Sequence, residues 1–323
     1  FTRLSDSGLG CPDWPGCYGQ ASPLGAHAEI RAAQAALPSG PVTHGKAWVE
    51  MVHRYLASGV GMLVFALMVA SWVAHRRARG TGTAATPVSP WWATLTFVAI
   101  CLQGAFGAWT VTLKLYPAIV TMHLLLGLAL LALLAAQSQA YVQVPLALPR
   151  GTHTLLRVLA VLALLQIALG GWVSTNYAVL ACADFPTCQG HWWPPADYGQ
   201  GFTLLRPLGL DADGQPVAFA ALTAIHLAHR IGALAVLAVL LLLAWRLAAR
   251  GDPPQRRWAV ALGGVALWQL ASGLGNVVLG WPLAAALAHT AGAAALVVLL
   301  ATMLVRAHRS ARTAPAGALI AAS

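Results

Sequence analysis

Four histidines carry the strongest chemical signal in this sequence. His53, His123, His229 and His289 each fall near the same end of an apolar run, and an internal repeat relates the first two to the last two. One buried histidine is usually a hydrogen-bonded core residue, but four at matched depth indicate metal ligands. Imidazole nitrogen binds iron, zinc and copper, and two histidines on facing helices of a bundle hold a haem from both sides. The pattern predicts one tetrapyrrole in each half, because each half has too few donors for zinc.

Two cysteine loops indicate that the chain contains two copies of one unit. Residues 11–17 (CPDWPGC) and 182–188 (CADFPTC) share the pattern Cys-x-Asp-aromatic-Pro-x-Cys, which is specific enough to indicate a repeat. Other residues match at equal spacing: Gln103, Gly107 and His123 with Gln269, Gly273 and His289, and His53-Arg54 with His229-Arg230. We place the two halves at residues 1–145 and 146–323.

Glu50 is the one acidic residue at the start of an apolar run; the other acidic residues lie in loops. An ionisable group in a membrane helix is costly and indicates function; the alternative is a carboxylate solvated among lipid headgroups. His53 follows on the same helix face, where a carboxylate orients an imidazole or relays protons. His226 takes the position of Glu50 in the second half. We therefore predict catalysis in the first half and a structural or electron-transfer haem in the second.

Arg54 and Arg230 each directly follow one of the four histidines. This position makes them candidates to pair with haem propionates, because guanidinium and carboxylate groups form strong charge-assisted hydrogen bonds. The alternative is that both side chains extend to the membrane interface, as long basic side chains near helix ends often do. The sequence does not choose between these two roles.

The cysteines of the two loops also have two interpretations. Cys11 with Cys17 and Cys182 with Cys188 form intraloop disulfides if these loops face an oxidising compartment. Alternatively, a labile pair passes electrons to a cofactor or a quinone. Cys101 lies within an apolar run, and we expect it to be buried and inert.

Composition defines the elements that must position these residues. The 323 residues are 59% hydrophobic and only 9% charged, with a mean hydropathy of +0.69, which excludes a water-soluble globular protein. A membrane-spanning helix needs about 20 apolar residues. The chain contains seven apolar runs of that kind, at about residues 48–74, 91–112, 117–140, 154–175, 220–245, 257–279 and 283–305.

The distribution of basic residues predicts the orientation. The net charge of +10 would suggest nucleic acid in a soluble protein, but topology explains it and no nucleic-acid partner is expected. Arginines gather in alternate loops and the C-terminal tail, which the positive-inside rule places in the cytoplasm: Arg76, Arg77, Arg79, Arg150, Arg246, Arg250, Arg256, Arg257, Arg306, Arg309 and Arg312. We therefore predict a multi-pass protein of the bacterial inner membrane. Its haem sites and cysteine loops face the periplasm, and its C-terminus is cytoplasmic.

The repeat also predicts a further helix. In the second copy an apolar run at residues 154–175 precedes the cysteine loop, whereas the first copy begins at Phe1 without one. We expect an all-α membrane protein of two pseudo-symmetric four-helix bundles, with eight transmembrane helices in the intact protein and seven visible here. An even number of helices per half makes the two repeats parallel.

These motifs together resemble the heme A synthase family, in its membrane-bound, two-repeat, cysteine-pair-containing bacterial form. The resemblance covers nearly the whole chain and rests on specific segments: residues 2–17 (TRLSDSGLGCPDWPGC), Glu50-x-x-His53-Arg54, residues 107–111 (GAWTV) and His226-x-x-His229-Arg230. The departure from the family is the absent first helix, without which the substrate bundle lacks a wall.

The resemblance implies an oxidoreductase that converts the C8 methyl group of heme O to the formyl group of heme A by successive hydroxylation. It implies a heme b cofactor whose iron is held by His229 and His289. It also implies a heme O substrate flanked by His53 and His123, with Glu50 as an essential catalytic carboxylate. The first half would then be the substrate-haem bundle and the second the cofactor-haem bundle.

The partners implied are heme O, heme O synthase, the terminal oxidase under assembly and the lipid bilayer, and association with further copies of the chain is left open. Three other functions remain alternatives. A non-catalytic di-haem b electron carrier needs the histidines but gives Glu50 and the cysteine loops no role. A disulfide or quinone oxidoreductase leaves the four histidines unexplained. A transporter fits parallel repeats, but broken helices and charges at the membrane midplane are not evident.

Overall fold

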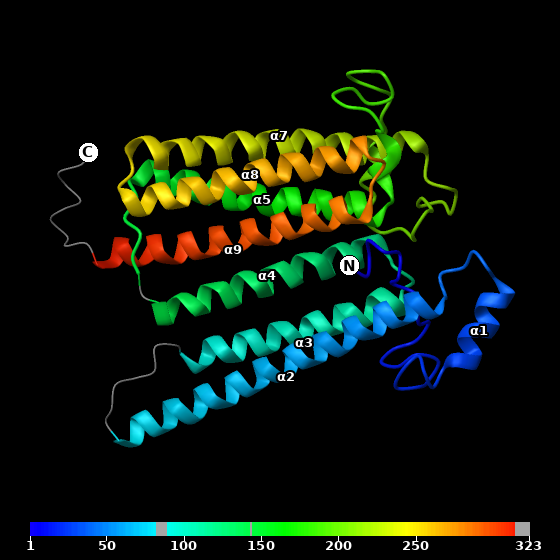
Figure 1. Ribbon diagram of the computed structural model, residues 1–323, viewed down its shortest axis with the longest axis horizontal. Coiled ribbons are helices and arrows are strands. Elements are labelled where there is room, and N and C mark those ends of the chain that lie inside the picture. The colour runs from blue at the N-terminus through cyan, green and yellow to red at the C-terminus, as the bar shows by residue number, and fades with distance from the viewer. Residues whose placement is uncertain (82–88, 143, 314–323) are drawn as a thin grey trace.

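The computed structural model describes residues 1–81, 89–142 and 144–313, and this part of the chain is helical (Figure 1). Seven of its helices are long and apolar enough to cross a membrane, and each coincides with a predicted run. They are α2 (His44–Thr81), α3 (Pro90–Thr112), α4 (Pro117–Val142), α5 (Arg150–Thr175), α7 (Phe219–Arg250), α8 (Pro253–Val278) and α9 (Leu283–Thr313). The prediction of an all-α, multi-pass membrane protein is confirmed. The predicted second half ends in residues 314–323, which lie outside the described residues, as do the side chains of Arg250 and Arg312.

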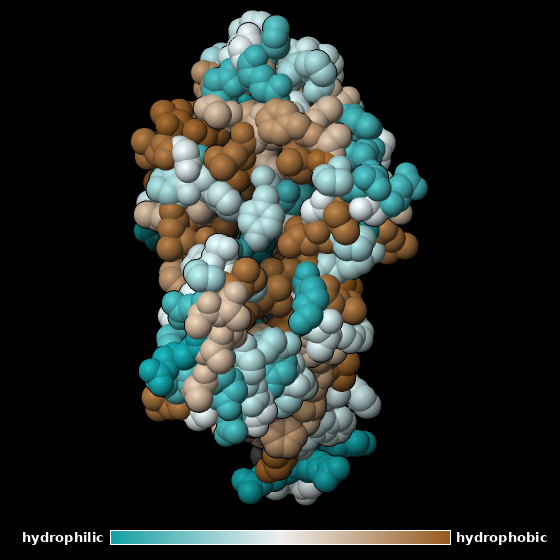
Figure 2. All heavy atoms as spheres, turned by 90° about the vertical axis from the view of Figure 1, so that its right-hand side faces the viewer, coloured by the Kyte–Doolittle hydropathy of each residue, from teal (hydrophilic) through white to brown (hydrophobic). Residues whose placement is uncertain are grey.

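The two ends of the helical bundle differ in character. One end, here called the loop end, carries residues 1–43 and 176–218, with the short helices α1 (His27–Ala36), η1 (Ala178–Ala181) and α6 (Tyr198–Gly201). It lies on the right in Figure 1 and faces the viewer in Figure 2, where hydrophilic and hydrophobic residues are interspersed. The other end, here called the arginine end, carries the arginine-rich connections. Their separation onto opposite ends matches the predicted alternation of loops.

The internal repeat is visible in the turns between helices. The turn from α3 to α4 places Lys114 and Leu115 in the left-handed region, and the turn from α8 to α9 does the same for Gly280 and Trp281. The N–H of Leu115 donates to Thr110 O over 2.8 Å, and the N–H of Trp281 donates to Asn276 O over the same distance. Equivalent helices are thus closed by equivalent backbone conformations.

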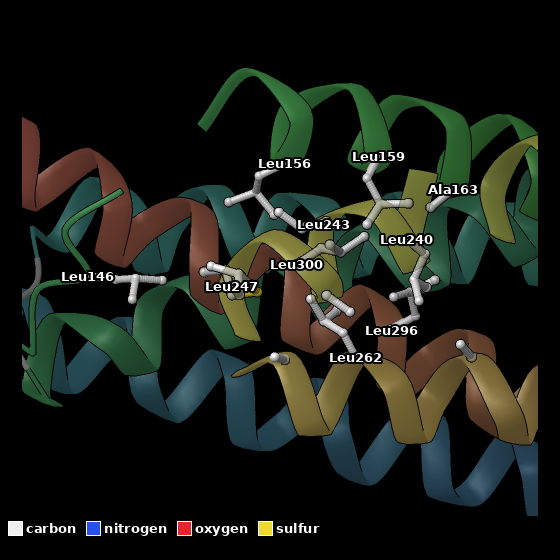
Figure 3. Close-up of a cluster of buried hydrophobic side chains, with 14 residues drawn as sticks. Leu146, Leu156, Leu159, Ala163, Leu240, Leu243, Leu247, Leu262, Leu296 and Leu300 are labelled. Carbon is white, nitrogen blue, oxygen red and sulfur yellow. The ribbon is translucent and has the colours of Figure 1, made fainter. Parts of the chain in front are cut away.

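The second half forms a closed four-helix bundle. α5 packs against α7 and α9, and α8 packs against the same two helices. Its core consists of buried leucines concentrated toward the arginine end (Figure 3). These include Leu156 and Leu159 of α5, Leu243 of α7, Leu262 of α8 and Leu300 of α9. Leu146, in the segment before α5, also packs in this core. The proposed boundary between residues 145 and 146 therefore assigns Leu146 to the half with which it packs.

The first half is arranged as three helices in a row. α2 packs against α3 and α3 packs against α4, but within the described residues α2 and α4 are not in contact. α4 also packs against α5 and α9 and so joins the two halves. Thr121 of α4 and Thr175 of α5 are hydrogen-bonded through their hydroxyl oxygens at 3.2 Å. The eighth helix and the division into two domains stay predictions.

A polar contact joins the halves at the loop end. The Tyr177 hydroxyl donates to Asp6 Oδ1 over 2.7 Å, and Lys46 Nζ lies 3.3 Å from Asp6 Oδ2. The Arg3 guanidinium lies 4.1 Å from the centre of the Tyr177 ring and donates to the Ser174 carbonyl. Burial alone would raise the pKa of Asp6, but the Tyr177 hydrogen bond and the attraction of Lys46 and Arg3 hold that pKa below its usual value.

The leucine core predicts a position-dependent stability effect. We expect Leu243→Ala to lower the free energy of unfolding by about 2 kcal/mol or more, because the cavity left in a closed bundle removes packing contacts. Leu234→Ala on the same helix is the matched control, since Leu234 is 68% exposed and Leu243 is fully buried. Thermal unfolding in detergent measures both. Equal losses would contradict the assignment of this core.

The contact between the halves predicts a pH dependence. Because the folded-state pKa of Asp6 is lowered, its stabilisation is present above the ordinary carboxyl pKa and is lost as the pH falls through the lower folded value. We expect Asp6→Asn to cost at most about 1 kcal/mol at neutral pH, since the carboxylate is half exposed. The difference in melting temperature from wild type should shrink under acid. Asp213→Asn, at an exposed loop position, should show no such dependence.

Candidate functional site

His229 and His289 face each other inside the second-half bundle, near its loop end. His229 comes from α7 and His289 from α9, and their ring centroids are 6.4 Å apart. An imidazole–metal bond is about 2 Å long, so two imidazoles on opposite sides of one metal have ring centres roughly 6 Å apart. The observed separation would therefore allow both histidines to bind one haem iron. In the described part of the chain no group of three or more His, Cys, Asp or Glu side chains could hold a metal ion, which favours a two-histidine haem site over a zinc site.

The predicted first-half pair lies on the row of three helices. His53 is on α2 and His123 is on α4, each near the loop end of its helix. Helix α3 lies between α2 and α4, so the pairing of His53 with His123 stays a prediction. His53 is exposed whereas His123 is partly buried. All four predicted histidines thus lie toward the loop ends of their helices, and His229 faces His289.

Three of these histidines pack against a glycine of a neighbouring helix. A Cβ atom built on the glycine would lie only 3.1–3.2 Å from the Cε1 atom of the ring. The pairs are Gly107 of α3 with His123, Gly170 of α5 with His229, and Gly273 of α8 with His289. A methyl group at these positions would require the imidazole to shift by a few tenths of an ångström, so glycine lets the rings pack closely between the helices.

Gly170 was missed by the sequence analysis, and so was Gln166 before it. Gln166 and Gly170 repeat the Gln-x-x-x-Gly spacing of Gln103 with Gly107, and of Gln269 with Gly273. That spacing was the available signal. The match was overlooked because a long loop separates the helix of Gln166 from His229. The number of residues from Gln166 to His229 therefore differs from the number in the other two glutamine–histidine pairs.

Glu50 is buried and both its carboxylate oxygens are engaged. The residue is 3% exposed. Its Oε2 atom accepts the backbone N–H of Cys11 at 2.9 Å, and its Oε1 atom accepts a hydrogen bond from Arg54 at 2.5 Å. The alternative of a carboxylate solvated among headgroups is therefore wrong. Glu50 links the first cysteine loop to α2, one helical turn from His53.

Arg54 and Arg230 hold the two cysteine loops. Arg54 Nη1 donates to the carbonyl oxygens of Asp13, Pro15 and Gly16 at 2.6–3.1 Å. Arg230 makes the equivalent bonds in the second half, at 2.8–3.0 Å, to the carbonyls of Cys182, Asp184 and Thr187. These bonds differ from both roles that the sequence predicted for the two arginines. Contact with haem propionates stays a prediction for both arginines.

The cysteine loops have the same construction in both halves. Disulfides join Cys11 to Cys17 and Cys182 to Cys188, and these cysteines are at most 2% exposed. Burial favours a structural role over exchange with external thiols, because labile disulfides are strained or exposed. In the second loop Asp184 accepts hydrogen bonds from the Thr187 hydroxyl and two backbone N–H groups, and these lower its pKa to about 2.

His226 occupies the place that Glu50 has in the first half. It is buried, and its Nδ1 atom lies 3.1 Å from the carbonyl oxygen of Ala178 in η1. Both residues thus attach a loop-end segment to the transmembrane helix. Only the first half has a carboxylate there, which is the main chemical difference between the two sites.

Cys101 differs from expectation. It was predicted to be buried within its span, but it is a free and exposed cysteine on α3. Helix α3 is apolar around most of its surface, so the sequence did not determine which side faces outward. In a membrane this surface is covered by lipid, and exposure does not imply contact with water.

Comparison with known proteins agrees with this geometry. The family described as cytochrome oxidase assembly protein (COX15-CtaA) matches residues 1–301. The chain is 38% identical to "Heme A synthase" of Shewanella oneidensis over 94% of its length and 89% of the relative. It is 33% identical to "Heme A synthase" of Sphingopyxis alaskensis, with 96% and 86% covered, and 30% identical to that of Mesorhizobium japonicum, with 89% and 79% covered.

The glycine contacts predict a local effect on haem binding. We expect Gly170→Ala to lower the haem-to-protein ratio after detergent washing, through a loss of affinity of about tenfold or more, because the new methyl group displaces the His229 ring. Gly264→Ala is the control, since no atom outside its own helix lies within 4 Å of that position. Absorbance of the bound haem measures the ratio. An unchanged ratio in the first variant would show that the contact does not position the ring.

Proposed function

The chain belongs to the heme A synthase family of cytochrome oxidase assembly proteins, and from that premise we propose that it oxidises the C8 methyl group of heme O to the formyl group of heme A by successive hydroxylation. The observation that carries the proposal is the pair of opposed imidazoles, His229 and His289, 6.4 Å apart. The first half adds a buried carboxylate, Glu50, three residues before His53. A haem site without a carboxylate fits a bound cofactor, and a haem site with a carboxylate fits a substrate.

The cofactor is heme b, with His229 and His289 as its two iron ligands. A haem with two histidine ligands supplies one-electron redox chemistry. The chain holds both rings by packing each against a glycine, Gly170 and Gly273. In each ring the Nδ1 atom faces a polar side chain, Gln166 for His229 and Ser272 for His289. The Nε2 atoms are then the ring nitrogens left for the metal.

The substrate lies against His53 and His123. His53 is exposed, and apolar side chains on the same helix, including Leu56 and Leu63, are exposed as well. Heme O carries a long apolar tail, so a site that opens toward lipid suits both its entry and the departure of the product. This arrangement supports the first half, residues 1–145, as the substrate half and residues 146–323 as the cofactor half.

Glu50 is proposed to handle protons at the substrate site. Oxidation of a methyl group removes protons as well as electrons, so the site needs a base. Glu50 lies three residues before His53 on the same helix and is shielded from water. Its carboxylate also anchors the N–H of Cys11, and a variant at this position must therefore be tested for loop integrity as well as for turnover.

The orientation proposed is that of a bacterial inner-membrane protein, with the loop end toward the periplasm and the arginine end in the cytoplasm. The positive-inside rule supports this orientation, and the two disulfides fit an oxidising compartment. We propose that heme O synthase supplies the substrate and that the terminal oxidase receives the product during its assembly.

The test is the haem content of the protein purified after coexpression with a heme O source. We expect Glu50→Gln to abolish heme A and its hydroxylated intermediate while heme B stays bound, because Gln keeps an acceptor for the Cys11 N–H but cannot take up a proton. Haems are extracted and identified by chromatography and mass. Glu29→Gln, at an exposed position of α1, is the control, and thiol labelling shows whether the Cys11–Cys17 disulfide persists.

Two outcomes would count against the proposal. Full heme A production by Glu50→Gln with an intact disulfide would remove Glu50 from the proton chemistry. If the wild-type protein contains heme B alone although heme O is supplied, the di-haem electron carrier replaces the synthase as the better function.

A further inference from the structure

Three glutamines occupy equivalent positions on the helices that run toward the loop end. Gln103, Gln166 and Gln269 lie nine residues before the last residue of α3, α5 and α8, respectively. Each amide nitrogen donates to the main-chain carbonyl of a histidine on the next transmembrane helix of its half, over 2.9 Å. The recipients are His123, His229 and His289, the last with the Gln269 amide turned so that its nitrogen faces the histidine.

In the second half the same amides also reach the imidazole ring. Gln166 Nε2 lies 2.9 Å from His229 Nδ1, and the Gln269 amide nitrogen lies 3.2 Å from His289 Nδ1. In the first half the Gln103 amide nitrogen bonds to the main-chain carbonyl of His123 and not to its ring. His123 Nδ1 is buried and has no hydrogen-bond partner among the described residues, and neither has Gln103 Oε1. Two of the three rings are therefore held at both the main chain and the ring, and the third is not.

A glycine three residues after the histidine explains the difference. Gly232 follows His229 and Gly292 follows His289 at this spacing. A Cβ at Gly292 would lie 2.6 Å from Trp268 Cδ1 and 2.8 Å from the Gln269 amide atom that faces His289, and a Cβ at Gly232 would overlap Gln166 Oε1. The amides thus occupy space that only glycine leaves open.

The first-half histidines have leucine at that position, Leu56 after His53 and Leu126 after His123. Gln103 instead packs beside Gly127, one residue further along α4, where a Cβ would lie 3.0 Å from its Nε2 atom. The second-half histidines thus carry the motif His-x-x-Gly, and the first-half histidines carry His-x-x-Leu. This difference distinguishes the two sites in the sequence alone.

We propose that Gln166 and Gln269, seated on Gly232 and Gly292, are positioning residues that fix the imidazoles of the second half and make it the site that retains its haem. The first half, whose His123 Nδ1 has no hydrogen-bond partner among the described residues, exchanges its haem. The proposal rests on the proposed function, in which the second haem is a resident cofactor and the first is substrate and product. Outer-shell partners of ligating histidines contribute about 10–100-fold to metal affinity. A fixed ring also loses less conformational freedom on ligation.

The amide suits a ring that changes its proton on metal binding. Ligation through Nε2 leaves the proton of a neutral imidazole on Nδ1, so Nδ1 then needs an acceptor. Gln166 Oε1 is buried without a partner in the observed orientation. A half-turn of the amide would present it to Nδ1–H, in exchange for the bond from Nε2 to the His229 carbonyl. The two orientations occupy the same space. For His289 the hydroxyl of Ser272, 3.1 Å from Nδ1, offers a second acceptor.

The experiment measures the rate at which heme B leaves the purified full-length protein for excess apomyoglobin. We expect Gln166→Ala to raise this rate about tenfold or more. Gly232→Ala should do the same while Gln166 is kept in the sequence, because the new methyl group displaces the end of the Gln166 side chain. Gln103→Ala and Gly263→Ala, the latter with no neighbour within 4 Å, should leave the heme B rate unchanged.

A conservative variant separates positioning from general packing. Gln166→Glu keeps an acceptor for Nδ1–H, so heme B should be retained while its midpoint potential falls, because an anionic partner makes the ligand more basic. A wild-type dissociation rate in both Gln166→Ala and Gly232→Ala would overturn the proposal. Absence of heme B from the wild-type protein would overturn the cofactor assignment and this proposal together, whereas absence of heme A alone would overturn only the proposed reaction.

Discussion

The approach of a histidine ring to a glycine on the neighbouring helix is the contact on which the site depends. It occurs at His123, His229 and His289, and in each case a methyl group in place of the glycine hydrogen would crowd the ring carbon. The contact fixes how closely two helices pass and at which level they do so. A planar ring can then lie between helices that pack tightly elsewhere. Because the glycines and histidines repeat in register, the same spacing is produced at corresponding levels of both halves.

Packing along the second-half bundle is layered around that level. Buried leucines fill the bundle toward the arginine end, and a second buried cluster that includes Trp172, Val173 and Ile225 lies toward the loop end. The histidines and their glycines lie between these two layers. The leucine layer joins α5, α7, α8 and α9, and the loop-end cluster joins α5, η1 and α7, so α5 and α7 are packed on both sides of the histidine level. The residues that stabilise the bundle are therefore different from the residues that form the site.

The two halves share a construction and differ in a few chemical groups. Both attach a buried disulfide loop to a transmembrane helix through an arginine that binds loop carbonyls, and both place a second polar residue one turn before a histidine. That residue is Glu50 in one half and His226 in the other. The ring-holding amides are complete in one half only. The repeat therefore supplies two similar arrangements of histidines, and the residues beside them differ, with a buried carboxylate in one half and ring-holding amides in the other.

Periodic and local features of the sequence were enough to predict the seven spans, the repeat, the histidine set and the loop cysteines. Apolar runs must become helices in a bilayer because their backbone groups have no other hydrogen-bond partners. The repeated motifs can be recognised directly in the amino-acid sequence. The rotation of each helix about its axis could not be read in this way, because a helix that is apolar on most sides has no strong preferred face. That rotation decides that Cys101 faces outward, that Glu50 is buried against Cys11, and that Arg54 and Arg230 bind the loops. It also decides that α4 joins the halves and that the amides of Gln166 and Gln269 reach a ring. These relations depend on the contacts of several helices at once, and only the tertiary structure fixes them.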